Sequence, residues 1–389
     1  MSGGPGQLQS WFGMAFFSRP SAGVTRRVVL LVHLWTGLVV SSYALLIGLS
    51  GAALTFRAEL QDRAYPEFFT GPPAGGVLAD VTVVVEQLRQ RYPGYRFSGV
   101  DYPTARRHSF LAYVAKDGED LRTVFSDSVT GRVLGELPRD GWIQRLQDLH
   151  FNLLMGSTGY VVSGIGAMCL VLLVVTGPVL WWPGVSRWTE ALSVHAGRGW
   201  RRVIRECHWV TGVWTAGLLL LWAITGVYFC FPGQFREAVN VVLPLTTTRP
   251  PVSAGSPLGE DVPFNVLVSR AQALVPGAQI ARLSLPATDT GSVGVVLARR
   301  EHGDFDTSDQ VTAYFDRHTG EALALDDQRS RSVGDDVIRW LGVLHVGSFG
   351  GTPIRLLWMV TGLAFPLLAV TGVVTWWTGR SGHTRRDNP

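Results

Sequence analysis

Four long apolar stretches restrict the fold of this chain more than any other feature of its sequence. They lie at about residues 28–56, 159–182, 209–232 and 354–377. Each is long enough to cross a hydrocarbon layer of roughly 30 Å as a helix. The composition agrees, since 47% of the residues are apolar, only 16% are charged and 14 are tryptophans. The sequence therefore predicts a membrane protein with four spanning helices.

The arginines predict how these helices are oriented. They cluster before the first stretch, between the second and third, and after the fourth, as Arg19, Arg26, Arg27, Arg187, Arg198, Arg201, Arg202, Arg205, Arg380, Arg385 and Arg386. All these short segments fall on one side of the membrane, which the positive-inside rule assigns to the cytoplasm. The same bias explains much of the net charge of +4, so the charge does not indicate a nucleic-acid partner.

We therefore expect a multi-pass membrane protein with both termini in the cytoplasm and two large loops on the outer side, in a periplasm or its equivalent. The expected organisation is a cytoplasmic segment at 1–27, spans at 28–56, 151–182, 207–232 and 351–378, extracytoplasmic domains at 57–150 and 233–350, a cytoplasmic loop at 183–206 and a cytoplasmic tail at 379–389. The first stretch is too long for the apolar region of a signal peptide, so we interpret it as a span.

The membrane segments repeat one pattern, and both copies carry histidines at matching places. His33-Leu-Trp-Thr-Gly37 returns as His208-Trp-Val-Thr-Gly212, and Leu149-His150 returns as Leu344-His345. A Val-Thr-Gly and a Trp-Trp follow the second histidine of each copy. A histidine inside a spanning helix costs free energy unless it is paired or coordinated. A tandem duplication with two matched histidine pairs therefore suggests two equivalent metal or haem sites.

The two long loops also repeat one order of elements. Each begins with a helical pattern, at 80–92 and 264–274, and continues with alternating apolar segments, at 95–102, 110–115 and 122–126 and again at 278–285, 294–299 and 311–315. An Asp-x-x-Thr-Gly follows in both loops, at Asp127 and Asp316. This motif is a turn signal between two strands. The loops are therefore predicted to form two small α+β modules, so the fold class is a membrane α-helical bundle of four spans with two extracytoplasmic α+β domains.

At these motifs the chain resembles the PepSY-associated transmembrane family. The resemblance runs from about Thr25 to Gly379 and rests on the His-x-x-Thr-Gly openings, the two Asp-x-x-Thr-Gly turns, and the Leu-His with its downstream Thr-Gly and Trp-Trp. It implies that the loop modules are PepSY-like. It also implies a haem-bearing inner-membrane protein that passes electrons outward to an iron chelate, as the family's ferric siderophore reductases do.

The depth of the histidines predicts how they pair. His33 and His208 lie about 5–8 Å inside the arginine-rich ends of their spans, at 1.5 Å per residue. His150 and His345 lie at the other end, so a single iron cannot join the two levels, which are separated by roughly 30 Å. We expect His33 with His208 on one haem b and His150 with His345 on a second. Hydrogen bonding between helices is the alternative role for His33 and His208. For His150 the alternative is a helix break in the region of Gly156 and Gly159, which would place it in an interfacial segment.

Glycines accompany the first histidine of each copy. Gly37 and Gly212 follow four residues later, and Gly51 and Gly226 follow after 18 residues, which is five helical turns. The spacing places them on the same helical face as the histidine. We predict that this stripe leaves space for a flat macrocycle.

The other polar and aromatic candidates have plain interpretations. His108, His195, His302, His318 and His383 have no duplicated counterparts and are expected on the solvated surface. Cys169, Cys207 and Cys230 are expected to be small packing residues without a disulfide. The Trp-Trp pairs are typical of headgroup anchors, although they could line a haem edge. The arginine cluster is a topology signal that could also bind haem propionates or an acidic electron donor.

The expected function is reduction of Fe(III) to Fe(II) in a periplasmic ferric siderophore. Because no dinucleotide-binding or Walker motif is present, the electrons would come from a quinol or from a separate cytoplasmic reductase. Tyr102, Arg106 and Arg107 are candidate substrate contacts. The alternative is a membrane-anchored PepSY binding or regulatory protein without redox activity. A transporter is disfavoured because the centres of the spans lack Asp and Glu.

Overall fold

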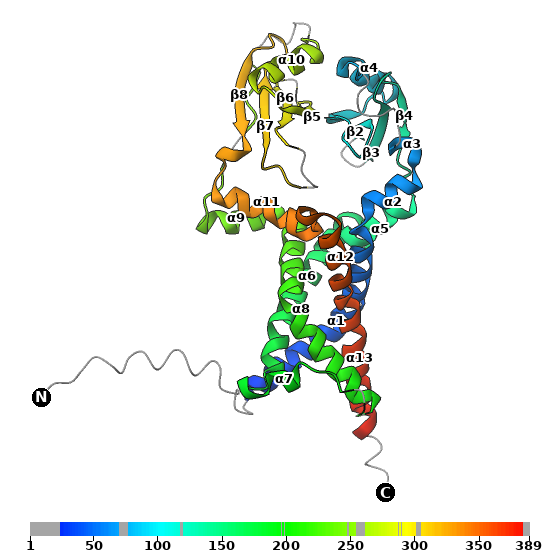
Figure 1. Ribbon diagram of the computed structural model, residues 1–389, viewed down its shortest axis with the longest axis vertical. Coiled ribbons are helices and arrows are strands. Elements are labelled where there is room, and N and C mark those ends of the chain that lie inside the picture. Colours follow the sequence, from blue (N-terminus) through cyan, green and yellow to red (C-terminus); the bar gives the residue numbers. More distant parts are fainter. Residues whose placement is uncertain are drawn as a thin grey trace, which may run out of the picture. The chain divides into compact units, whose positions relative to one another are not determined.

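The computed structural model describes residues 24–69, 77–116, 120–195, 197, 199–246, 249–253, 261–286, 288, 290–300 and 305–383 (Figure 1). The chain forms two compact units. The first consists of Met1–Thr55, Leu146–Phe235 and Gly350–Pro389, and the second of Phe56–Arg145 and Arg236–Phe349. Arg19, His302, Arg198, Arg385 and Arg386 lie outside the described residues.

The first unit is a helical bundle. Its long helices are α1 (Val24–Leu54), α6 (Gly156–Trp181) and α8 (Trp200–Cys230), joined by the consecutive pair α12 (Gly351–Gly362) and α13 (Ala364–His383). Helix α1 packs against α6 and α13, and α8 packs against the same two helices. The interior contains small and branched side chains such as Ala44, Leu219 and Ala223, whereas most apolar side chains on the outside are exposed. An apolar exterior is typical of helices that face lipid. Four helical segments are long and apolar enough to cross a membrane, so this is a membrane protein.

The helix boundaries differ from the predicted spans at three places. A separate helix α5 (Trp142–Asn152) precedes α6, and between them Leu153 and Leu154 have positive φ angles of 54° and 62°. Helix α8 starts at Trp200, inside the segment expected to be a loop, after the short helices η1 (Val185–Arg187) and α7 (Trp188–Ala191). The last span is interrupted at Leu363. Pro366 explains this break, because a proline has no N–H and its ring clashes with the carbonyl four residues earlier.

The second unit is built on one antiparallel sheet of eight strands. The strands are β1 (Arg96–Asp101), β2 (Ser109–Lys116), β3 (Asp120–Asp127), β4 (Val133–Glu136), β5 (Gln279–Ser284), β6 (Val293–Ala298), β7 (Gln310–Phe315) and β8 (Ala322–Asp327). Their order in the sheet is β4-β3-β2-β1-β5-β6-β7-β8. Each predicted loop module therefore supplies four consecutive strands, and the two sets join through β1 and β5.

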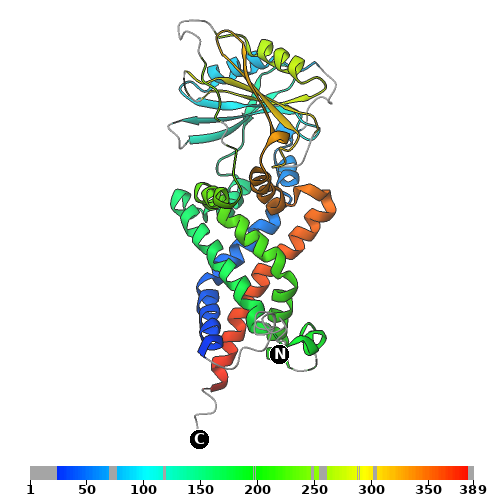
Figure 2. The same cartoon turned by 90° about the vertical axis from the view of Figure 1, so that its left-hand side faces the viewer.

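Two helices cover one face of this sheet. Helices α4 (Val81–Arg91) and α10 (Phe264–Leu274) contact each other and pack against the strands, and both lie on the same side of the sheet in Figure 2. The buried core contains Val84, Leu88 and Leu267 from the helices and Val100 and Leu283 from the strands. Because side chains alternate along a strand, the residues next to Val100 and Leu283 point to the opposite face.

The join between β1 and β5 is centred on Val100, which lies opposite Leu283. Gly99 lies opposite Ser284, and Asp101 lies opposite Arg282. A side chain at Gly99 could not be accommodated, because its Cβ would lie 2.3 Å from the carbonyl oxygen of Leu283. The backbone at Gly99 also has a φ of 151°, which disfavours any other residue. This glycine permits the two strand sets to merge into one sheet.

Both predicted Asp-x-x-Thr-Gly turns are present. The side chain of Asp127 accepts hydrogen bonds from the backbone N–H groups of Val129 and Thr130 at 3.0 and 2.7 Å. Asp316 accepts from His318 and Thr319, both at 2.9 Å. Backbone N–H donors stabilise the ionised carboxylate, and the pKa of Asp127 is therefore lowered.

The second unit contains four further helices: α2 (Arg57–Ala64), α3 (Pro66–Phe69), α9 (Pro232–Val242) and α11 (Val333–Val346). Helix α11 begins with a capping box in which the Ser332 hydroxyl accepts from the N–H of Asp335, and it ends at Gly347 in the left-handed conformation. In the first unit Cys169, Cys207 and Cys230 are free thiols, as the sequence predicts.

Candidate functional site

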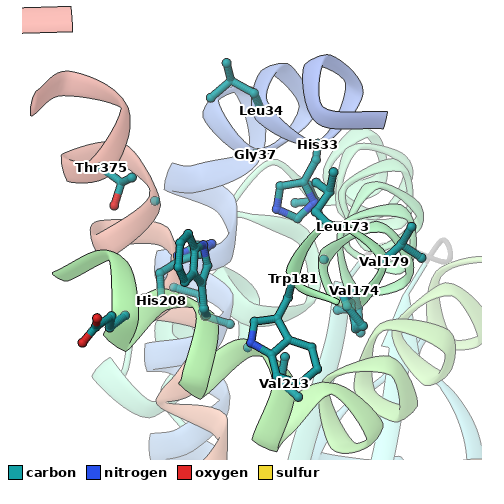
Figure 3. A pocket seen from close by; sticks show the side chains of 18 of the residues that line it. His33, Leu34, Gly37, Leu173, Val174, Val179, Trp181, His208, Val213 and Thr375 are labelled. Carbon is teal, nitrogen blue, oxygen red and sulfur yellow. The ribbon is translucent and has the colours of Figure 1, made fainter. Parts of the chain in front are cut away.

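A large cavity in the helical bundle brings together two of the four predicted histidines. Its volume is about 920 Å³, and its lining includes His33 from α1 and His208 from α8. Figure 3 shows both rings beside this cavity, together with Trp181 from α6. Most of the remaining wall is apolar, with Leu34, Leu173 and Val174 among its residues. The volume is at the upper end of the range for cofactor and small-molecule sites, about 300–1,000 Å³.

A threonine determines the tautomer of His33. Nδ1 of the ring lies 2.8 Å from Oγ1 of Thr176. The Thr176 hydroxyl already donates to the carbonyl of Leu172, four residues earlier, at 2.7 Å. Because a hydroxyl has only one proton, we assign that proton to the bond with the Leu172 carbonyl and the donor role toward the threonine oxygen to the histidine. Nδ1 therefore carries the proton, and Nε2 keeps its lone pair.

His208 has the same arrangement in the other half of the bundle. Its Nδ1 lies 3.0 Å from Oγ1 of Thr371, and that hydroxyl donates to the carbonyl of Leu367 at 2.7 Å. In the part of the chain that the structure describes, Thr176 is the one hydrogen-bond partner of the His33 ring, whereas the His208 ring also bonds the backbone of Leu368. Two neutral imidazoles, each held by Nδ1 and each with a basic Nε2, are the form in which histidine binds a metal.

Glycines leave room for the two imidazoles. A Cβ added at Gly177 would lie 3.5 Å from Cε1 of His33, and one at Gly372 would lie 3.1 Å from Cε1 of His208. These are the glycines of the repeated Val-Thr-Gly, directly after the threonines that hold the rings. Larger side chains at these positions would push the rings away from their threonines.

The predicted glycine stripe is only partly correct. Gly37 and Gly212 line the cavity as expected. Gly51 instead lies against His150, since its added Cβ would be 2.8 Å from Cε1 of that ring. Gly226 packs toward Ala167 between α8 and α6. The 18-residue spacing gives the same helical face, but different neighbouring helices cover that face at the two ends.

His150 and His345 lie in different units, and each is described in its own surroundings. Nδ1 of His150, on α5, lies 3.0 Å from Oγ of Ser50, which donates to the carbonyl of Leu46 at 2.6 Å. The ring of His150 also bonds the backbone of Ile47, so it is held by two residues of α1. Burial lowers the pKa of His150 to about 4, so the ring is neutral at physiological pH. His345 lies in the last turn of α11 and is partly buried.

Polar side chains gather at the end of the cavity near the arginine-rich segments. Glu206, only 7% exposed, accepts the backbone N–H of His195 at 2.8 Å and the Nε–H of Arg202 at 2.7 Å. All three residues line the cavity, as do Arg26 and Arg187. The site residues predicted from the sequence did not include Glu206. From the sequence Glu206 belonged to the loop expected at 183–206. Only the start of α8 at Trp200 places it in a candidate span, where a carboxylate is a functional candidate by default.

The tryptophan pairs also contribute to this end of the cavity. Trp181, Trp182 and Trp376 line it, whereas Trp377 is 66% exposed. The arrangement of the first three favours the alternative that they border a bound ligand. Arg26 and Arg187 also line this end of the cavity, whereas the charge of Arg202 is already paired with Glu206 at 2.7 Å.

Several expectations about isolated residues are wrong. His195 and His318 are less exposed than expected: the His195 side chain is 33% exposed with Nδ1 3.4 Å from the Glu206 carboxylate, and the His318 side chain is 11% exposed beside Asp261. Tyr102 is buried in the sheet core and packs edge-on against Phe110, so it cannot contact a substrate. His108 is partly exposed. The side chain of His383 lies outside the described residues.

The two predicted arginine contacts are used inside the second unit. Arg106 is bound by two carboxylates of α2, those of Glu59 and Asp62, at 3.1 and 2.9 Å. Arg107 donates to the backbone carbonyls of Tyr102 and Ser109. Neither guanidinium is free to bind a ligand directly, because the loop between β1 and β2 folds back on its own neighbours.

Comparison with known proteins finds relatives of this chain. A family model described as "PepSY-associated TM region" matches residues 30–378. A protein of Pseudomonas aeruginosa, described only as uncharacterized, is 27% identical over 254 residues. The matched part covers 59% of this chain and 62% of that relative, so the chain spans less than two thirds of the relative's length.

Proposed function

The chain belongs to the PepSY-associated TM family, and we propose that it is a haem-bearing reductase of the bacterial inner membrane. In this proposal it passes electrons across the membrane to a ferric siderophore on the periplasmic side, where Fe(III) is reduced to Fe(II). Both termini would be cytoplasmic, and the sheet of the second unit would be periplasmic. Fe(II) binds hard oxygen ligands more weakly than Fe(III) does, so reduction would release the iron.

One observation carries the proposal: two neutral histidines share one cavity, and each has its Nδ1 held by a threonine. His33 and His208 would hold a haem b through Nε2, the nitrogen that is left with a lone pair. When bound, haem supplies a one-electron carrier whose potential depends on its axial ligands and their hydrogen bonds. The cavity is apolar along most of its length, as a macrocycle requires, and its arginines suit the two propionates.

The protein's own groups determine how such a site would work. Thr176 and Thr371 hold the imidazoles in one orientation. They also raise the basicity of the imidazoles, because each threonine oxygen accepts a hydrogen bond from Nδ1 of its histidine. Arg26 and Arg187 supply positive charge at one end of the cavity, where carboxylates of a ligand would be neutralised. The apolar wall excludes water from the rest of the site. No proton transfer is needed for an outer-sphere electron transfer to the iron chelate.

We further propose a second haem b on His150 and His345, the matched residues of the other histidine pair. The support is the repeated sequence, in which Leu149-His150 returns as Leu344-His345. Two haems would extend the electron path between the two sides of the membrane. The electrons would enter at the arginine-rich end, from a quinol or from a separate cytoplasmic reductase.

The test is an absorption spectrum of the purified protein before and after reduction with dithionite. We expect the Soret and α bands of six-coordinate b-type haem. Alanine at His33 or at His208 should remove the same fraction of the haem. Alanine at His150 or at His345 should remove the remaining fraction. The control is His108→Ala, at a partly exposed histidine, which should remove no haem. A colourless protein would refute the proposal and favour the non-redox binding role.

The reaction itself is tested with the reduced protein. Mixing it with a ferric siderophore under anaerobic conditions should reoxidise the haem and produce Fe(II), which a ferrous chelator would trap. The gallium(III) form of the same siderophore should leave the haem reduced. A haem that stays reduced with every ferric chelate would show that iron is not its acceptor.

A further inference from the structure

A buried carboxylate and a histidine lie together at the arginine-rich end of the bundle cavity. Glu206, on α8, is only 7% exposed, and its Oε2 accepts the backbone N–H of His195 at 2.8 Å. Nδ1 of the His195 ring lies 3.4 Å from the same oxygen. The other oxygen, Oε1, accepts from Nε of Arg202 at 2.7 Å. The carboxylate is therefore fixed from both sides, and all three residues line the cavity.

The carboxylate determines which nitrogen of His195 is basic. Glu206 forms an ion pair with Arg202, and an ionised carboxylate only accepts hydrogen bonds. Nδ1 of the neutral ring therefore carries the proton, and Nε2 keeps its lone pair. Both bonds that His195 makes within the described chain, through its backbone N–H and Nδ1, go to Glu206. The side chain is 33% exposed where it lines the cavity, so a ligand in the cavity can reach Nε2.

Tryptophans form part of the wall of the same cavity. Trp181 and Trp182 line it, and Figure 3 shows the Trp181 ring beside it. Nε1 of Trp181 donates to the carbonyl of Ala191 at 3.2 Å, which fixes this ring. Trp188 packs against both tryptophans, with its ring centre 6.1 Å from that of Trp181 and 5.2 Å from that of Trp182. A rigid aromatic wall suits a ligand with a flat ring.

Exposed apolar side chains border the cavity. Leu30 on α1, Val179 on α6 and Trp209 on α8 all line it, and each is at least 45% exposed. They therefore lie at its rim. Because these three helices are candidate spans, the rim is accessible from lipid, and a lipid-soluble ligand can enter without crossing water.

These groups together select the chemistry of the ligand. A group that binds Nε2 of His195 must donate a hydrogen bond, because this nitrogen only accepts. A carboxylate has no proton to donate there, and it would lie beside the negative charge of Glu206, whereas Arg26 and Arg187 remain available for propionates. A neutral, flat and lipid-soluble molecule with O–H groups satisfies all three conditions, and a quinol is such a molecule.

We propose that a quinol binds at this end of the cavity and that His195 is the catalytic base for its oxidation, with Glu206 as the positioning residue. The proposal rests on the function proposed above, which requires an electron donor. A protein donor would transfer electrons without a base inside the cavity, so the arrangement of His195 favours the quinol.

The reaction balances with two iron chelates for each quinol. Oxidation of one quinol to the quinone breaks both O–H bonds and releases two electrons and two protons. The electrons leave one at a time through the proposed haem and reduce two Fe(III) to two Fe(II). Each proton goes to Nε2 of His195 and then to water, which returns the ring to its neutral form before the next transfer.

The binding experiment compares menadiol with its dimethyl ether, which has the same ring system and no O–H group. Each ligand is dialysed anaerobically against the full-length protein in nanodiscs, with empty nanodiscs as the background. The protein is first reduced with dithionite, so that binding is not coupled to electron transfer. We expect menadiol to bind at least about tenfold more tightly than the ether.

His195→Leu should abolish this preference, and Glu206→Gln should reduce it. The affinity of both variants for the ether should stay unchanged, which shows that the cavity is intact. The control is His108→Leu, at a partly exposed histidine of the second unit, which should keep the full preference for menadiol.

A second measurement follows haem reduction after the oxidised protein is mixed with menadiol. A positioned base contributes about 10²–10⁴-fold to a rate, so His195→Leu should slow this reduction at least about tenfold. Reduction by dithionite needs no base and should keep its natural rate.

The outcomes separate this site from the proposed function. Equal affinity of the natural protein for menadiol and the ether would overturn the inference, and so would a preference or a rate of haem reduction that survives His195→Leu. With a normal haem spectrum, these results would leave the proposed function standing, with a cytoplasmic reductase as the donor. A colourless protein would refute the proposed function and the oxidation step, whereas the preference for menadiol would still decide whether the quinol site exists.

Discussion

The hydrogen bond between Thr176 and His33 can be tested by removing only the hydroxyl. In Thr176→Val the side chain keeps its shape, but the Nδ1 proton of His33 loses its acceptor at 2.8 Å. No other partner for Nδ1 is present among the described residues. A buried donor without an acceptor costs about 1–3 kcal/mol. This corresponds to roughly 5–150-fold in a binding constant, and the loss of a metal ligand's hydrogen-bond partner typically costs about 10–100-fold.

We therefore expect Thr176→Val to release haem about 10–100-fold more readily than the natural protein. The assay is transfer of haem to an excess of apomyoglobin, followed at the Soret band. The midpoint potential should also rise, because a less basic imidazole stabilises Fe(III) less. Thr371→Val should have a smaller effect in the same direction through His208, because the ring of His208 also bonds the backbone of Leu368.

The matched control is Thr215→Val. Thr215 lies on α8 and donates to the carbonyl of Thr211 at 2.7 Å, as Thr176 does to its own helix, but no histidine of the described chain binds it and it does not line the cavity. If Thr176→Val and Thr371→Val release haem no faster than Thr215→Val, the tautomer argument is wrong. The histidines would then need a different explanation.

The remaining predictions concern the rest of the fold. Gly99→Ala should destabilise the second unit by at least about 1–3 kcal/mol, because Gly99 has a φ of 151° and lies against the Leu283 carbonyl. The control is Gly94→Ala, which has a φ of 80° and open space around it and should cost only about 1 kcal/mol in a thermal melt. Equal losses of stability in the two variants would contradict the close approach at Gly99. Glu206→Gln weakens the charge-assisted hydrogen bonds from His195 and Arg202. Proteolysis within residues 183–199 should therefore become severalfold faster. Glu190, which is exposed and also lines the cavity, is the control, and Glu190→Gln should leave the rate of proteolysis unchanged. The N–H of Thr130 is the main cause of the lowered pKa of Asp127. The ionised carboxylate therefore stabilises the folded protein. This contribution is complete above the ordinary pKa of about 3.9 and is lost as the pH falls below it. The difference in melting temperature between the natural protein and Asp127→Asn should therefore narrow from pH 7 to about pH 3, and a constant difference would argue against it.

Much of the fold could be predicted from local patterns. Apolar length indicates the four spans, because lipid offers no hydrogen bonds to an unpaired backbone. Alternation of apolar residues and the two Asp-x-x-Thr-Gly turns predict the strands of the second unit. The breaks were only partly predictable. The interruption at Leu363 follows from Pro366, and the region of Gly156 and Gly159 indicated a break after His150, but α5 already ends before the positive φ angles of Leu153 and Leu154. Leucine gives no signal for such a conformation.

The repeated histidines show where prediction from sequence ends. The repeat alone selected His33 and His208 as partners, because matching positions reach the same depth in matching helices. It could not identify Thr176 and Thr371 as the groups that hold them, since more than 140 residues separate each threonine from its histidine along the chain. Only the packing of α1 against α6, and of α8 against α13, brings these side chains within hydrogen-bond distance.

The same distinction applies to charge. The sequence by itself determined that the arginines collect at one end of the spans, because hydropathy and charge are properties of each residue. Tertiary structure decided which of these charges meet. It buries Glu206 between His195 and Arg202, occupies Arg106 with two carboxylates, and leaves Arg57 without a partner among the described residues. Pairing depends on distances of a few ångströms between segments remote in the chain, and such distances arise only when the helices and strands pack.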